Sequence, residues 1–193
     1  ALEGSVFIGG SSIQWLRDGL RMFKNAKESE IYATRIASCD GVYVVPSFVG
    51  MGTPYWDNDA RGAIFGLTRA TSKEHIIRAT LEAIAFQSKD VMEVMKEESK
   101  LKLNSLAVDG GACANNFLMQ FQSDILQLPI IRMKTSEITA LGAASLAGLA
   151  VDFWKMEDLS HEESARILPV MEKVKADTLY KGWLHAVEAC RKY

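Results

Sequence analysis

The stretch from Leu106 to Phe117 holds the residues best suited to binding a ligand. An apolar run leads to the pair Gly110–Gly111, and Asn115 and Asn116 follow at the start of an expected helix. Because glycine has no Cβ, a ligand can approach the backbone closely at such a turn. The free N–H groups of a helix start favour an anion, and side-chain amides can bind a sugar or the edge of a base. A plain chain connection is the other interpretation.

This turn is not one of the standard phosphate-binding motifs. It lacks the Lys-Ser or Lys-Thr pair of a P-loop, and it lacks the third glycine of the dinucleotide fingerprint. The residue types therefore indicate a ligand without identifying it.

A second turn of the same kind lies near the start of the chain. Residues 5–8 predict a strand, a glycine pair predicts the turn, and a helix follows. Gln14 lies four residues after Gly10, and Asn115 lies four residues after Gly111. Each turn thus has a carboxamide about one helical turn beyond its glycine. If both strands belong to one sheet and end at the same edge, a ligand would bind between the two turns, as in open α/β sheets.

Other residues that could do chemistry have simpler explanations. Asp57 and Asp59 lie in a long loop and could bind a metal ion or act as acid and base, but solvated turn residues paired with Arg61 are the favoured interpretation. His75 could be a base, or a polar residue in the first turn of a helix. His161 and His185 have no partner motif.

The composition predicts one globular domain. The chain has 193 residues, a net charge of −2 and 48% hydrophobic residues, with no lysine or arginine stripe. Nucleic acid and membranes are therefore not expected partners. No signal peptide or membrane-length apolar run is seen. The chain begins at Ala1 and enters an expected strand almost at once, which predicts a domain cut from a longer protein.

The three cysteines predict a reducing, cytoplasmic setting. Cys39, Cys113 and Cys190 are far apart and have no His or Cys at metal-ligand spacing. Cys113 lies close to a helix start, where the helix dipole lowers a thiol pKa, whereas burial would cancel that effect.

The elements that must position these residues predict an α/β fold. Strands are expected within residues 42–45, 62–66 and 129–132, and helices within 29–38, 117–125, 139–148 and 161–193. The longest helix begins at the capping box of residues 71–74. Its apolar residues from Ile77 to Met95 share one face, and Glu82 and Lys89 fall on the others.

Two of these helices carry further expectations. Residues 139–148 are almost all small, which predicts close packing on the sheet. The tail from residue 161 predicts an amphipathic helix with Trp183, Leu184 and Val187 facing the core.

As a set, these stretches resemble the C-terminal lobe of the FGGY carbohydrate kinase family. The second signature of that family is matched by residues 62–67 followed by residues 75–82, which end at Glu82. Further matching blocks are residues 2–5, 13–18, 54–57, 60–62, 109–111, 115–122 and 139–144. Within the family these blocks are most similar to the kinases that phosphorylate glycerol.

The resemblance implies a fold and a set of binding residues. The fold is an actin-like ATPase (ribonuclease H-like) lobe, a mixed sheet flanked by helices, with residues 1–193 as the single C-terminal nucleotide-binding lobe of a two-lobe kinase. The positions that match the nucleotide-binding residues of the family are Gly10, Gln14, Gly111 and Asn115.

The resemblance also implies an activity for the whole protein. ATP and Mg²⁺ would be its cofactors, and glycerol would bind through an N-terminal lobe that this chain lacks. The general base lies upstream in such kinases, so no catalytic and no metal-binding residue is expected here, and this chain alone is expected to be inactive. The whole enzyme is expected to be a cytoplasmic homo-oligomer. A lobe of another sugar kinase of the family and an actin-like nucleotide-binding module without kinase activity remain the alternatives.

Overall fold

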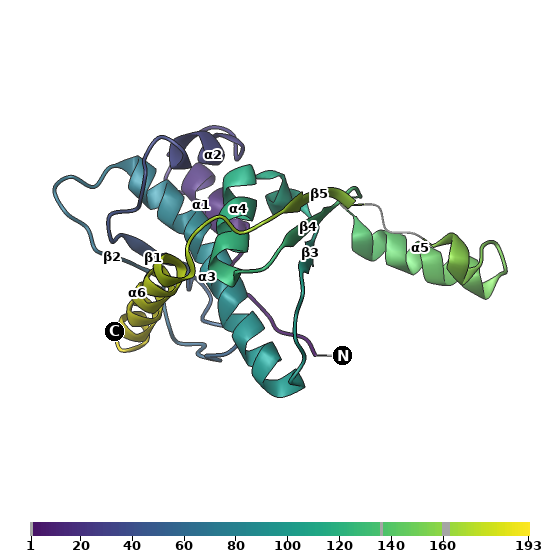
Figure 1. The fold of residues 1–193 in the computed structure, drawn as a ribbon. Coiled ribbons are helices and arrows are strands. Elements are labelled where there is room, and N and C mark those ends of the chain that lie inside the picture. Colours follow the sequence, from purple (N-terminus) through teal and green to yellow (C-terminus); the bar gives the residue numbers. More distant parts are fainter. Residues whose placement is uncertain (1, 136, 160–162) are drawn as a thin grey trace.

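The computed structural model describes residues 2–135, 137–159 and 163–193, which form a mixed α/β body with one projecting arm (Figure 1). The helices are α1 (Ser11–Asp18), α2 (Glu28–Ala33), α3 (Lys73–Ser99), α4 (Asn116–Leu126), α5 (Ile138–Ala150) and α6 (Lys173–Arg191), with short 3-10 helices η1 (Gly111–Ala114) and η2 (Met156–Asp158). The strands are β1 (Tyr43–Val45), β2 (Ala63–Phe65), β3 (Leu106–Val108), β4 (Ile130–Met133) and β5 (Glu163–Ile167). The predicted α/β class is confirmed.

The strands form two small sheets. β1 and β2 pair antiparallel, with Val44 opposite Ile64. In the second sheet β3 and β4 are parallel and β5 is antiparallel to β4, so the predicted mixed sheet is confirmed. The link from β3 to β4 runs through η1 and α4, which is the helical crossover that a parallel pair requires.

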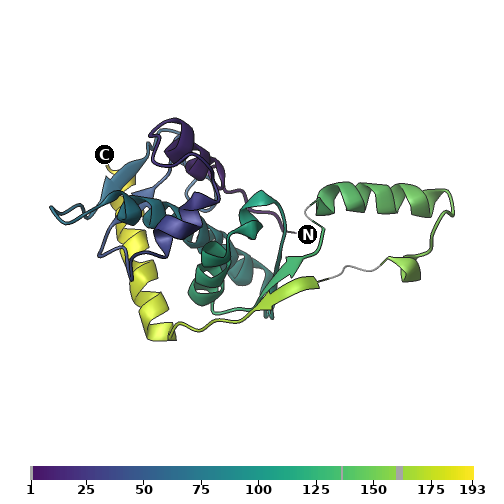
Figure 2. The ribbon, with the colours of Figure 1, turned by 90° about the horizontal axis from the view of Figure 1, so that it is seen from above.

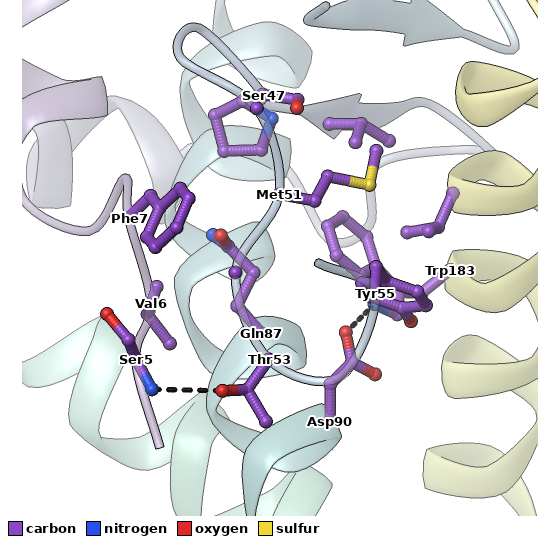
Figure 3. A pocket seen from close by; sticks show the side chains of 15 residues that line it. Ser5, Val6, Phe7, Ser47, Met51, Thr53, Tyr55, Gln87, Asp90 and Trp183 are labelled. Carbon is purple, nitrogen blue, oxygen red and sulfur yellow. Dashed lines mark hydrogen bonds between the residues drawn. The ribbon is translucent and has the colours of Figure 1, made fainter. Parts of the chain in front are cut away.

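Two predictions of local structure are wrong. Residues 5–8 are not a strand, because Ser5 pairs with the loop at Thr53 instead of with a sheet: Ser5 N–H donates to Thr53 Oγ1 (3.1 Å) and Thr53 N–H donates to Ser5 O (3.0 Å) (Figure 3). Residues 163–167 are strand β5 and not part of the tail helix, because their backbone groups pair with β4. The two glycine turns therefore do not leave from the edge of one sheet.

Helix α3 lies at the centre of the body and contacts α1, α2, α4, α6 and β1. It begins one residue later than the predicted capping box of residues 71–74, because Ser72 is the N-cap. The Ser72 N–H donates to Nδ1 of His75 (3.1 Å), so that His75 has a capping role. The prediction that Glu82 and Lys89 lie on outer faces is wrong, since both are buried. Helices cover α3 on several sides, and a single apolar face does not describe a helix in that position.

An aromatic cluster joins α3 to its neighbours. The buried ring of Phe86 stacks on Trp183 of α6, with centroids 5.4 Å apart, and meets Phe121 of α4 edge to face at 5.5 Å. Trp183 and Val187 face the core as predicted, whereas Leu184 is 39% exposed and does not.

Helix α5 projects away from the body, between β4 and β5 in the chain order (Figures 1 and 2). The prediction that it packs closely on the sheet is wrong. Its close approach is to Trp154 instead, whose Nε1–H donates to Ser145 O (2.9 Å) and whose ring lies against Gly148. The three strands β3, β4 and β5 are too short to give α5 a sheet face to cover.

The buried carboxylate of Asp90 fastens α6 to α3. Its oxygens accept hydrogen bonds from Tyr180 Oη (2.7 Å) and from Trp183 Nε1 (2.9 Å), and Asp90 and Trp183 lie together in Figure 3. Burial raises the pKa of Asp90, although hydrogen bonds from Tyr180, Trp183 and Tyr55 oppose this shift. The adjacent cavity of about 20 Å³ has room for about one water molecule.

In the described part of the chain, no helix is both long and apolar enough to cross a membrane.

Replacing Tyr180 by Phe is expected to lower the free energy of unfolding by about 1.5–3 kcal/mol, because a buried carboxylate loses one of its donors while the ring stays in place. Urea unfolding followed by circular dichroism measures this change. Tyr193→Phe at the exposed C-terminus is the matched control and should have no effect. Equal stability of the two variants would show that Asp90 does not depend on this donor.

Candidate functional site

A cavity of about 810 Å³ lies among α1, α2, α3, η1 and the start of α4. Gly10, Gln14, Gly111 and Asn115 all line it. The remaining lining residues are Ser11, Ile13, Arg17, Asn25, Ala26, Lys27, Ser29, Glu30, Leu81, Ile84, Ala112, Ala114 and Leu118. Cavities of this size hold small-molecule ligands in other proteins. The four residues that were predicted to share a site are therefore brought together.

The two glycine turns lie next to each other in the lining of this cavity. A Cβ added to Gly10 would have Ala112 Cβ of the second turn as its nearest neighbour, at 4.0 Å, and a Cβ added to Gly111 would meet no described heavy atom within 4 Å. Both glycines thus leave open space beside the backbone, as a closely approaching ligand requires. The turns meet here without a shared sheet edge, because α1 follows Gly10 directly and packs on α3.

The second turn holds Asn115 firmly. Gly110 has a φ of +86°, a conformation that favours glycine, and one turn of 3-10 helix leads from it to Asn115. Asn115 is the N-cap of α4, and its Oδ1 accepts the Leu118 N–H at 2.9 Å. Cys113 within this turn is buried and its thiol donates to Asp109 O (2.8 Å). Burial raises the pKa of Cys113, so the interpretation of this cysteine as a reactive thiolate is not supported.

Helix α2 forms a wall of the cavity that sequence reasoning missed. Asn115 Nδ2 donates to Ser29 Oγ (3.3 Å). Glu30 accepts the Asn116 N–H (3.1 Å) and Asn116 Nδ2–H (3.1 Å), which places a carboxylate at the start of α4, where a helix dipole favours negative charge. We call these contacts of Ser29 and Glu30 with Asn115 and Asn116 the α2 clamp. Residues 86 positions apart in the sequence form it, and no spacing rule connects them.

The cavity has an apolar interior and a polar rim. Its apolar lining comes from Ile13, Leu81, Ile84 and Leu118. On the rim, Gln14 has an exposed side chain with no hydrogen-bond partner within the described ranges. An apolar lining beside a free amide suits a flat apolar ring whose polar edge forms hydrogen bonds with that amide.

The other candidates from the sequence lie elsewhere and have structural roles. Asp57 Oδ1 accepts the N–H groups of Ala60 (3.0 Å) and Asp59 (3.1 Å), and the Ala60 bond is the main reason why the pKa of Asp57 is lowered. Its ion pair is with Arg191 (3.4 Å), whereas Arg61 binds backbone carbonyls. Asp57 is thus a turn residue, as the sequence analysis favoured, but its ion-pair partner is Arg191 and not Arg61.

No metal site is found in the part of the chain that the structure covers, since it contains no group of three His, Cys, Asp or Glu side chains suitable for an ion. His161 lies outside the described residues.

Comparisons with known proteins identify the family. A model of the C-terminal domain of the FGGY family of carbohydrate kinases matches residues 1–151. The chain is 61% identical to a glycerol kinase of Bacillus licheniformis, in an alignment that covers 100% of this chain and 40% of that protein. The chain belongs to the FGGY family of carbohydrate kinases.

Solved structures of FGGY kinases share this fold. The Plasmodium falciparum glycerol kinase with ADP matches with a TM-score of 0.87 and 34% identity, over 96% of this chain and 38% of that one. A gluconate kinase from Lactobacillus acidophilus matches with a TM-score of 0.80 and 25% identity, over 96% and 38% of the two chains. The predicted actin-like ATPase fold is therefore confirmed, and the chain spans 40% or less of the length of these relatives.

The FGGY signature block ends at a buried ion pair that anchors α2. Arg78 Nε donates to Glu82 Oε1 (2.8 Å), and the Arg78 NH1 group donates to the carbonyls of Ala33 (3.3 Å) and Ile36 at the end of α2. The guanidinium carbon also lies 4.9 Å from the ring centre of Phe117. Burial raises the pKa of Glu82, and Arg78 opposes that shift. The pair thus fixes the far end of the helix that the α2 clamp holds near the cavity.

Replacing Arg78 by Leu is expected to lower the free energy of unfolding by about 3–5 kcal/mol, because the Glu82 carboxylate would stay buried without its partner. The double variant Arg78→Leu/Glu82→Leu should recover much of this loss. Chemical unfolding of both variants measures the difference.

The exposed i, i+4 pair of Lys192 and Glu188 gives the matched control, and Lys192→Leu should cost less than about 1 kcal/mol. A double variant as unstable as Arg78→Leu alone would contradict the assigned role of the ion pair.

Proposed function

We propose that this chain is the nucleotide-binding lobe of an ATP-dependent glycerol kinase, which converts ATP and glycerol to ADP and glycerol 3-phosphate in glycerol catabolism. The observation that carries the proposal is the single cavity lined by Gly10, Gln14, Gly111 and Asn115. These positions match the nucleotide-binding positions of the family. A similar structure, from Plasmodium falciparum, was solved with ADP.

The substrate is inferred from the relatives. The 61% identity to a glycerol kinase is far higher than the 25% identity to a gluconate kinase, and this difference favours glycerol over another sugar. The residues that would read the substrate and the general base are expected in the N-terminal lobe of the whole enzyme, which we propose to be a cytoplasmic homo-oligomer. This lobe, residues 1–193, would then supply nucleotide binding alone.

The geometry fits an adenine nucleotide. Between Ile13, Leu81 and Ile84, the apolar lining can take the faces of the base. The Gln14 amide on the rim can hydrogen-bond a polar edge, and the open backbone at the glycine turns lets the sugar and phosphates come close. Asn115 contributes through its fixed position, because its amide is already committed to Leu118 and Ser29.

The residues described here contain no group of three His, Cys, Asp or Glu side chains that could hold a magnesium ion. In the proposed enzyme Mg²⁺ would neutralise the phosphates, and the phosphates with the other lobe would have to hold it. We therefore assign no step of the reaction to a metal bound by this chain.

The variant Gly111→Val tests the site. A valine here enters open space beside the cavity, so ADP affinity should fall at least about tenfold while the free energy of unfolding changes by less than about 1 kcal/mol. Calorimetric titration with ADP, together with urea unfolding, measures both effects.

The control is Gly142→Val on the projecting helix α5, where an added Cβ is equally free of contacts. It should leave ADP binding unchanged. An unchanged ADP affinity in folded Gly111→Val would remove Gly111 from the site.

The isolated chain is expected to bind adenine nucleotides weakly and to phosphorylate nothing. In this proposal the contacts to the adenosine part come from this lobe, whereas most phosphate contacts and the closure of two lobes belong to the whole enzyme. We expect dissociation constants no better than high micromolar, about 5–6 kcal/mol of binding free energy, with ATP, ADP and adenosine nearly equal.

Two assays decide this point. Isothermal titration ranks the three ligands, and a coupled assay with ATP and glycerol measures turnover. A strong Mg²⁺-dependent preference for ATP would place the phosphate site within this chain, and glycerol phosphorylation above background would place the general base here as well. No binding of any of the three would favour a structural role for the cavity.

A further inference from the structure

A second hollow, of about 730 Å³, lies on a different part of the body, between the C-terminal half of α3, the segment of residues 100–103 and the start of α6. It shares no lining residue with the nucleotide cavity. Its charged lining consists of Lys89, Lys96, Lys100, Lys102 and Lys173 with Glu93 and Asp177. We call it the lysine hollow. Lys96 pairs with Glu93 and Lys173 pairs with Asp177, so Lys89, Lys100 and Lys102 give the hollow an excess positive charge, although the chain as a whole has a net charge of −2.

A buried cation lines this hollow. Lys89 is only 8% exposed, and its Nζ donates to Ile125 O (3.0 Å) and lies 4.5 Å from the ring centre of Tyr180. Within the described ranges its ammonium forms no ion pair with a carboxylate. Glu93 and Asp177 of the same lining favour its charge from a distance, but burial outweighs them and lowers the pKa of Lys89. An anion in the hollow would offset this cost of burial. An ammonium has three N–H donors, so the carbonyl of Ile125 does not use them all.

The start of α6 adds a second feature that an anion would stabilise. The first turn of this helix contains Lys173 and Lys175 and no acidic residue, and the N-cap residue, Glu172, makes no side-chain capping hydrogen bond. A helix start has a partial positive charge, which disfavours cations and attracts anions. Lys173 is relieved in part by its ion pair with Asp177.

The helix dipoles alone do not explain why five lysines gather in this hollow. Lys96 and Lys100 lie at the C-terminus of α3, where the helix dipole favours cations. That explanation does not extend to Lys89, in the middle of α3, or to Lys173, at the opposite kind of helix end. Lys100 and Lys102 are exposed and have no carboxylate partner among the described residues, so both remain free for a ligand.

We propose that the lysine hollow binds a small anion with two or more negative charges, of the phosphate-ester class. Lys100, Lys102 and the backbone N–H groups at the start of α6 would contact the charged groups, with Lys89 beneath them. Lysine suits this task as a mobile point charge on a long stem. Leu101 and Leu103 in the same lining offer apolar surface to the rest of the ligand.

Pyrophosphate serves as the probe. In a titration of the ¹⁵N-labelled chain followed by NMR, we expect saturable shifts of the amides of residues 100–103 and 173–177. The double variant Lys100→Gln/Lys102→Gln should weaken binding about tenfold, and added NaCl should weaken it in the wild type. Both side chains are exposed, so the variant should keep its fold.

The matched control removes two positive charges elsewhere. Arg69→Gln/Lys155→Gln lowers the net charge equally at exposed positions outside the hollow and should bind pyrophosphate as the wild type does. Equal weakening in both double variants would show an unspecific charge effect and overturn the proposal. Shifts confined to residues 9–14 and 110–116 would place the anion in the nucleotide cavity instead, and the absence of saturable shifts would show that no such site exists.

Discussion

The burial of α3 is the constraint on which the rest of this structure depends. A 27-residue helix contacts α1, α2, α4, α6 and β1, so its middle has no face that can stay in water. Three charged residues of that stretch are buried, and each has different partners: Glu82 has an arginine one turn away, Lys89 has a carbonyl and a ring, and Asp90 has two donors from α6. These contacts place α2, α4 and α6 around α3. They also set the positions of the elements that enclose the cavity.

The sequence predicted the two turns that line the cavity because their residues follow local rules. A glycine needed for positive φ at position 110, an open turn at Gly111 and an asparagine N-cap each depend on neighbours within a few residues. The second glycine turn was found by the same signal. These features can be read from a single sequence because the backbone enforces them locally.

The predictions failed where the outcome depends on contacts between distant residues. Residues 5–8 have an apolar pattern but pair with a loop, and residues 163–167 follow a helical prediction but complete a sheet. The same limit hid the contact of α2 with the cavity, where Glu30 accepts the N–H of Asn116 from 86 positions away. Periodicity also misplaced Glu82 and Lys89, since it assumes that a helix has a solvent face. Helix α5 was predicted to pack on the sheet because its residues are small. It projects from the body instead, because the short strands of this chain offer no sheet surface for it to cover.

The small size of α2 has a consequence for how a ligand would enter the cavity. A six-residue helix is not stable by itself in water, so α2 exists only while the clamp and Arg78 hold it. Its opening is therefore a local unfolding event whose free energy reflects a handful of hydrogen bonds and not the stability of the whole body. A molecule resting against this wall would slow amide hydrogen exchange in α2, even if the average structure stayed the same.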